Sequence, residues 1–159
     1  MKNHARKNKS DRRGAVAVEF AVIAPVLLAI VLGLVEVNRI YETQHLLETA
    51  AREGARFAAM DRDGLMSDGQ AGNDKLADDV KTFLEANGLP REDIAVEVKD
   101  FENPNQDFDI DDPDNELRLF TVEVSIDYSS VSFTPVESGD DYPLAASVTF
   151  RNGVATISQ

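Results

Sequence analysis

One apolar stretch constrains this chain more than any other feature. It runs from Arg12 to Val35 and reads RRGAVAVEFAVIAPVLLAIVLGLV, with no charged residue between Phe20 and Val35. A helix of about 20 apolar residues is long enough to cross the hydrocarbon core of a bilayer. The stretch therefore predicts a single-pass membrane helix, and it raises the question of why a carboxylate, Glu19, lies inside its leading edge.

The charges on either side of this stretch predict its orientation. The 159-residue chain has a net charge of −13, but residues 1–13 hold six Lys or Arg and one Asp, a net +5, so the rest carries −18. Basic residues directly before an apolar span mark the cytoplasmic side. We therefore expect a cytoplasmic N-terminus, with the residues from about Glu36 onward outside the cytoplasm; in a bacterium this is the periplasm or beyond. The bulk negative charge argues against nucleic acid as a partner, and leaves membrane lipid as one.

Other interpretations of the stretch fit less well. A cleaved secretory signal would need a shorter apolar core followed by a small-x-small site, and the residues after the core are Leu34, Val35, Glu36, Val37 and Asn38. Glu19 has two explanations. It either reaches headgroup water from the first turn of the span, or it meets a cation at the same depth on another subunit. A cut after Gly14 would create such a cation, the amine of Ala15, one turn from a neighbouring Glu19.

The helix is predicted to continue beyond the membrane. Apart from Gly54, no helix breaker occurs between Val35 and Met60, so one helix is expected from Ala15 to Ala59, roughly 68 Å long at about 1.5 Å per residue. Its second half has an apolar face at three- and four-residue spacing. The predicted packing face on this half consists of Leu47, Ala51, Gly54 and Ala58. Its side chains become smaller along the helix, which allows close approach to a partner surface.

The remaining residues predict a small α+β head. A loop is expected at 61–73 and a short helix at Asp74–Asn87, with Asp74 as its N-cap and Gly88 as its stop. Period-two alternation then predicts antiparallel strands at Ile94–Lys99, Leu117–Tyr128 (with a bulge near Phe120) and Tyr142–Phe150, and a short edge at Val154–Ile157. The fold class is α+β, a long N-terminal transmembrane and amphipathic helix packed on a small antiparallel sheet, with a second short helix. The expected division is a basic leader (1–14), a transmembrane helix (15–35), its continuation outside the membrane (36–60) and an acidic head (61–159).

Catalytic chemistry is not indicated. The chain has no Cys, and its two histidines, His4 and His45, are isolated. Asp107, Asp109 and Asp111 have the spacing of the first calcium ligands of an EF-hand, but Asp112 and Arg118 replace the required Gly and Glu. These three are weak metal candidates, and we interpret 101–116 as a solvated acidic loop. The protein is expected not to be an enzyme and to need no cofactor.

Several motifs together resemble known proteins. Gly14, Glu19 and the aromatic Phe20, followed by a long apolar helix, resemble type IV pilin-like precursors. Within this group, the sequence more specifically resembles TadE-like proteins of Tad (tight adherence) pilus systems. It is carried by the run Ala17–Leu28, the step from Gly33 to Glu36, the AAREGAR box at Ala50–Arg56 and the YPLAASVTFR segment at Tyr142–Arg151.

The resemblance implies a minor pseudopilin, a structural component of a Tad/Flp pilus assembly or secretion machine, located in the bacterial inner membrane with its head in the periplasm. It implies leader cleavage between Gly14 and Ala15 by a prepilin peptidase, and a subunit contact within the membrane made by Glu19 and Phe20. The implied partners are the major Flp pilin, other pilin-like subunits and inner-membrane platform proteins, with incorporation in a pilus as one fate. The alternative is an uncleaved, membrane-tethered extracytoplasmic binding domain, with calcium as one possible ligand.

Overall fold

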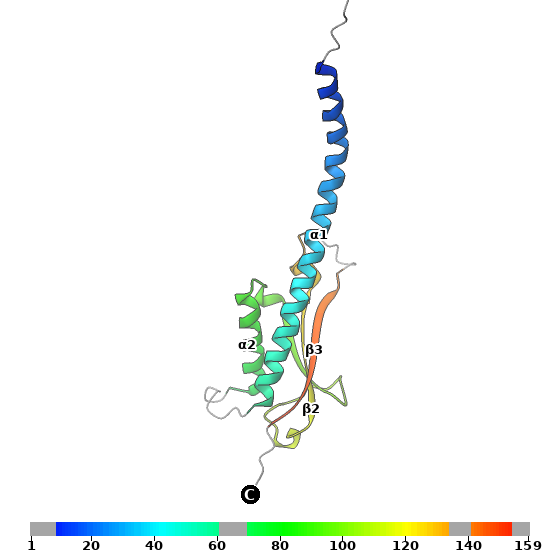
Figure 1. Cartoon of the computed structure of the whole chain (residues 1–159). Coiled ribbons are helices and arrows are strands. Elements are labelled where there is room, and N and C mark those ends of the chain that lie inside the picture. Colours follow the sequence, from blue (N-terminus) through cyan, green and yellow to red (C-terminus); the bar gives the residue numbers. More distant parts are fainter. Residues whose placement is uncertain (1–8, 61–69, 134–140, 154–159) are drawn as a thin grey trace, which may run out of the picture. The chain divides into compact units, whose positions relative to one another are not determined.

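The computed structural model describes residues 9–60, 70–133 and 141–153, and the predicted α+β fold class is confirmed (Figure 1). The chain divides into two compact units, residues 1–38 and 39–159. Helix α1 (Lys9–Ala59) contributes to both. The second unit adds α2 (Gly72–Ala86), β1 (Ile94–Asp100), β2 (Leu119–Asp127), β3 (Pro143–Arg151) and 3₁₀ turns at Arg91–Asp93, Pro113–Asn115 and Tyr128–Ser130.

Helix α1 begins earlier than predicted. The sequence predicted a helix from Ala15, after a basic leader, whereas the helix already starts at Lys9. Extending an existing helix adds one hydrogen bond for each residue ordered, so basic residues with good helix propensity join it at little cost. Pro25 lies inside α1. Because proline has no N–H, the carbonyl group four residues earlier loses its usual helical partner there.

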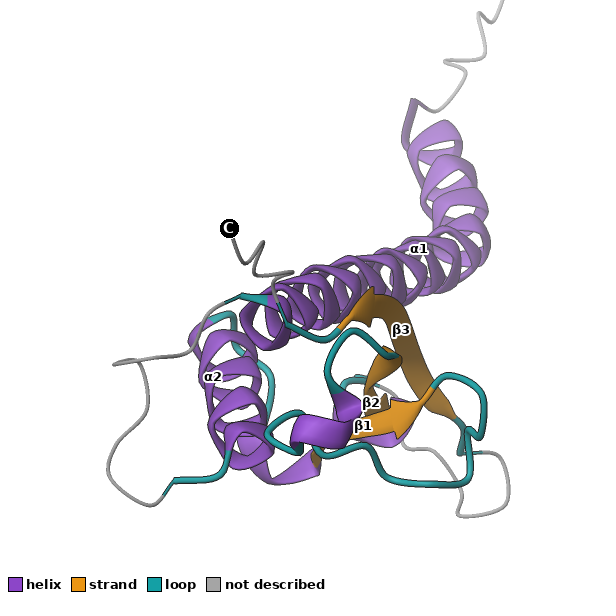
Figure 2. Ribbon diagram, turned by 90° about the horizontal axis from the view of Figure 1, so that it is seen from below, coloured by secondary structure: helices purple, strands orange, loops and turns teal. Residues whose placement is uncertain are grey.

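In the second unit, one face of α1 is buried in the core. The buried positions recur every three or four residues, and they are Thr43, Leu47, Ala50, Ala51, Gly54, Ala55 and Ala58. The opposite face carries exposed ion pairs between Glu48 and Arg52 and between Glu53 and Arg56. Figure 2 shows α1 and α2 on one side of this core and the three strands on the other. Small residues on α1 thus form a shallow surface on which larger side chains pack.

Helix α2 starts at Gly72, so the predicted N-cap at Asp74 is wrong. The cap position is Ala71, which provides no side-chain hydrogen bond. Instead, the Gly72 N–H donates to a carboxylate oxygen of Asp111, 39 residues further along the chain. The other end agrees with the sequence. Gly88 has a φ of +89°, and two backbone hydrogen bonds close the helix end as a Schellman motif.

The sheet is antiparallel with the order β1-β2-β3. Its register runs without interruption through Phe120, so the predicted bulge is wrong. The inward side chains of β2 are Phe120, Val122, Val124 and Ile126. Leu119 faces outward, and Leu117 precedes the strand with a φ of +63°. The bulge was predicted because the period-two alternation was counted from Leu117 and Leu119, and neither leucine belongs to the inward series. The predicted edge at Val154–Ile157 lies outside the described residues.

The acidic connection between β1 and β2 is not simply a solvated loop. Phe108 and Ile110 are buried in the core, and the Phe108 ring stacks on Phe120 with centroids 5.5 Å apart. Buried Asn152 donates side-chain hydrogen bonds to the carbonyl groups of Ile110 (3.0 Å) and Asn115 (3.2 Å). The prediction of full solvation is therefore wrong for this segment, because apolar residues alternate with its carboxylates and bind it to the head.

Candidate functional site

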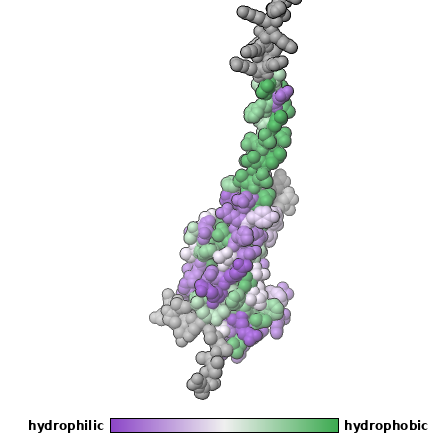
Figure 3. Space-filling model, viewed as in Figure 1, coloured by the Kyte–Doolittle hydropathy of each residue, from purple (hydrophilic) through white to green (hydrophobic). Residues whose placement is uncertain are grey.

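The candidate site is the apolar half of α1, from Gly14 to Asn38. Its large apolar side chains are exposed on all sides of the helix, including Phe20 at 67% and Leu34 at 65% (Figure 3). Monomeric soluble proteins rarely expose apolar patches beyond a few hundred Å². Within the described part of the chain, one helix is long and apolar enough to cross a membrane, and no residue of its apolar 18-residue stretch is buried. This segment therefore serves as a membrane anchor.

The predicted cleavage and contact residues all lie on this half of α1. Gly14, Ala15, Glu19 and Phe20 are exposed and helical. Ala15 and Glu19 are four residues apart, so they lie one above the other on the same side of the helix. A Cβ atom added at Gly14 would meet nothing within 4 Å. The structure thus leaves this end of the helix open to contacts from outside the chain.

The predicted packing face lies within the head itself. Leu47, Ala51 and Ala58 are fully buried, and Gly54 is buried with them. A Cβ added at Gly54 would lie 2.9 Å from Cγ2 of Val80 on α2. This is the close approach that a glycine allows. The face is therefore covered by elements of the same chain, and a partner subunit does not need to cover it.

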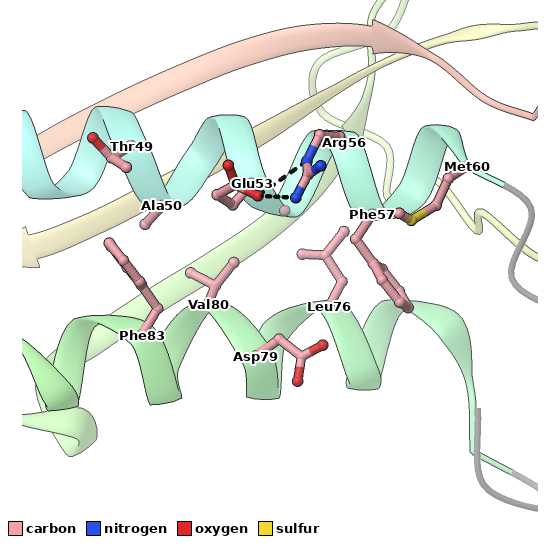
Figure 4. Close-up of a pocket in the computed structure, with 11 residues that line it drawn as sticks. Thr49, Ala50, Glu53, Arg56, Phe57, Met60, Leu76, Asp79, Val80 and Phe83 are labelled. Atoms are coloured by element: carbon pink, nitrogen blue, oxygen red, sulfur yellow. Dashed lines mark hydrogen bonds and ion pairs between the residues drawn. The ribbon is translucent and has the colours of Figure 1, made fainter. Parts of the chain in front are cut away.

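A groove of about 480 Å³ lies beside this contact, between α1 and α2 (Figure 4). Its walls are mostly apolar, and Phe57, Val80 and Phe83 point into it from the two helices. At its rim, the Glu53 carboxylate pairs with the Arg56 guanidinium at 2.7 Å. Asp79, which also lines the groove, pairs with Lys75. Each charged side chain that lines the groove among the described residues is thus already paired, which leaves little to orient a polar ligand.

The three weak metal candidates are not brought together. Asp107 pairs with Lys99 at 3.0 Å, and this hydrogen bond raises the pKa of Lys99 above its ordinary value. Asp109 accepts a hydrogen bond from the backbone N–H of Asp111, and Asp111 itself caps α2. In the described ranges, no group of three or more His, Asp or Glu side chains could hold a metal ion. These carboxylates organise the loop and its contacts.

Sequence reasoning missed two polar features of the head. The buried carboxylate of Asp100 pairs with Arg118, and Asn152 ties together two loops distant in sequence. It also missed Arg39, whose guanidinium lies 4.2 Å from the ring centroid of Phe133. The available signal for Arg39 was its place directly after the apolar half of α1. Nothing in the sequence near Phe133 indicated that the two residues would meet.

One exposed apolar helix joined to a small α+β head defines a membrane-anchored protein with a single anchoring helix among its described residues. Residues 14–56, 43 of the 159, match the family model of TadE-like proteins, which confirms the resemblance over this segment. No curated protein and no solved structure matches the chain. The match supports a protein associated with Tad pili; TadE-like proteins form a structural family that is not known for enzymatic activity. The likeness at Tyr142–Arg151 lies outside the matched residues.

Proposed function

We propose that this protein is a TadE-like minor pseudopilin, a structural component of a Tad/Flp pilus assembly or secretion machine. The observation that carries the proposal is the fully exposed apolar half of α1, over which the family match begins at Gly14. A helix that buries none of its apolar surface within its own chain has that surface free for lipid and for neighbouring helices. The proposed location is the inner membrane, with the N-terminus in the cytoplasm and the head in the periplasm.

Leader removal by a prepilin peptidase is proposed between Gly14 and Ala15. The helix runs through this bond, from Lys9 onward, so a peptidase must open the first turns of α1 to reach it. Glycine is about 1 kcal/mol less favourable than alanine inside a helix. Gly14 therefore makes this part of the helix easier to unwind, and a Cβ atom added there would meet nothing within 4 Å.

Glu19 is proposed as the subunit contact within the membrane. A carboxylate near the centre of a bilayer costs roughly 2.5–3.5 kcal/mol on insertion scales, and less near the interface. After cleavage, the new amine of Ala15 would lie one helical turn from Glu19 of an adjacent subunit, such as the major Flp pilin. Pairing the two charges would offset the cost of holding each in lipid, and would set the depth at which neighbouring helices pack. Phe20 would pack beside this contact.

N-terminal mass spectrometry of the protein from its own host tests the cleavage. The mature chain should begin at Ala15, and a chain that keeps residues 1–13 would contradict the proposal. Gly14→Ala should slow processing, because it strengthens the helix at the bond to be cut. Gly33→Ala is the matched control: it is also a glycine on α1 with nothing within 4 Å of an added Cβ, and should leave processing unchanged.

Glu19→Gln tests the subunit contact. The variant should still insert in the membrane, because the uncharged side chain is easier to bury, but pilus output should fall sharply. Glu42→Gln is the control, because Glu42 is an exposed carboxylate of the same helix in the head unit. Normal pilus output from Glu19→Gln would refute the charge pairing. Loss of output from both variants would instead indicate a general requirement for charge on α1. Co-purification with platform proteins, compared between the variants, would locate the step that fails.

A further inference from the structure

Four aromatic residues of the 39–159 unit lie either close to Arg39 or at the paired ends of β2 and β3. We call Tyr41, Tyr128, Phe133 and Tyr142 the aromatic collar; they include every tyrosine of the chain. Tyr41 is 65% exposed, Phe133 67% and Tyr142 46%, whereas Tyr128 is half-buried. Large exposed rings are costly in water and are enriched in surfaces that meet another phase or partner.

The head holds these rings in place through several contacts. Tyr128 and Tyr142 stack with centroids 5.0 Å apart, and the Tyr128 N–H donates to the Tyr142 carbonyl at 3.0 Å. They flank the pair Asp127 and Pro143, where β2 ends and β3 begins. Phe133 is held by the guanidinium of Arg39, 4.2 Å from its ring centroid. The collar thus comes from α1, from the ends of two strands and from the segment that follows the Tyr128–Ser130 turn.

Chain continuity places Arg39, and with it the Phe133 ring that it contacts, a few residues after the apolar half of α1. Arg39 directly follows Asn38, and the exposed apolar series continues as far as Val35 and Val37. Four residues of helix separate Val35 from Arg39, a rise of roughly 6 Å. The polar headgroup layer on each side of a bilayer is about 5–8 Å thick. A ring in contact with Arg39 is therefore within reach of that layer when the apolar helix spans the membrane.

We propose that the aromatic collar rests in the phospholipid headgroup layer while the protein is anchored in the membrane. Tyrosine is enriched at this depth, because its ring is apolar and its hydroxyl group finds polar partners. Arg39 reaches toward lipid phosphate while it covers the face of Phe133. The collar would hold the head at a fixed height on the membrane, and would thereby present the remainder of its surface to other subunits.

The charges around the collar limit how deep it lies. Glu42, Asp127 and Asp141 are exposed near these rings, and carboxylates are costly to move into hydrocarbon. The rings are therefore placed among the headgroups and not among the acyl chains. A second copy of the chain is the competing occupant. Lipid is favoured because Arg39, which contacts Phe133, directly follows an exposed apolar helical segment that itself requires lipid.

Fluorescence quenching tests this placement directly. The chain has no Trp, so Phe133→Trp creates a single reporter in the full-length protein. Phe101→Trp is the matched control: it replaces an exposed Phe (50%) beyond the far end of β1, where the Phe101 N–H donates to the Leu119 carbonyl. Both variants are placed in phosphatidylcholine vesicles, with and without spin label at the headgroup or bromine on the acyl chains.

The Phe133→Trp emission should be shifted to the blue and quenched several-fold more by headgroup label than the Phe101→Trp emission. Equal, water-like emission from both would overturn the proposal. Emission from Phe133→Trp that changes with protein density, but not with lipid label, would also overturn it in favour of a second copy. Tyr41→Trp, on α1, provides a second reporter if Phe133→Trp does not reproduce the wild-type circular dichroism.

Discussion

Replacing Gly54 by alanine tests the close contact between α1 and α2. A Cβ at this position would lie 2.9 Å from Cγ2 of Val80 and 3.4 Å from Cδ2 of Leu76. The first distance is too short for two carbon atoms, so either the helices or the Val80 side chain must shift. Valine is stiff at χ1, so Val80 has little freedom to move away.

Two opposing effects set the size of the change. Alanine is about 1 kcal/mol better than glycine inside a helix. Overpacking a filled core costs about 1–3 kcal/mol. We therefore expect Gly54→Ala to lower the free energy of unfolding by about 1 kcal/mol. In a Val80→Ala background the clash is absent, so the same substitution should raise the free energy of unfolding by about 1 kcal/mol. The double-mutant cycle should give a coupling of about 2 kcal/mol.

Urea unfolding of the full chain in mild detergent measures these differences through tyrosine fluorescence. All three tyrosines lie in the 39–159 unit, so the signal reports on the head. Gly33→Ala controls for helix propensity, because nothing lies within 4 Å of its added Cβ. A Gly54→Ala variant at least as stable as the wild type would refute the reasoning. The same sign in both Val80 backgrounds would show that Val80 does not impose the contact.

Three further predictions concern the loops of the head. Asn152→Ala should cost about 1–3 kcal/mol in the free energy of unfolding, because it removes the two buried hydrogen bonds that Asn152 donates to the Ile110 and Asn115 carbonyl groups; urea unfolding measures the loss. Asp111→Ala should cost about 1 kcal/mol and speed amide hydrogen exchange at Gly72, the first residue of α2, whereas slow exchange there would contradict the capping role. Asp107→Asn should lower the pKa of Lys99, which is raised above 10.5 chiefly by the Asp107 hydrogen bond. The stability from this pair is fully present below pH 10.5 and is lost as the pH rises through the higher folded-state pKa. NMR titration of Lys99 in the wild type and in Asp107→Asn measures the change in its pKa. The same Lys99 pKa in both proteins would contradict the contact.

Much of this protein follows from patterns that are local in sequence. A long uncharged apolar run has few structural solutions, and a single helix across a membrane is one of them. Period-two alternation placed all three strands to within two residues, and Gly88 marked the end of α2. The resemblance at Gly14, Glu19 and Phe20 rested on fixed spacing, which is also local. These features depend on backbone geometry and side-chain period, and both can be read from the chain itself.

The tertiary structure decided what depends on residues distant in sequence. Asp111 caps α2 from 39 positions away, so the start of that helix moved to Gly72. Pairing with β1 and β3 placed Phe120 in the inward series, and burial of Phe108 tied the acidic loop to the core. Each outcome is a contact between segments whose meeting the local pattern does not encode, because burial and hydrogen-bond partners are assigned only when the whole chain has packed.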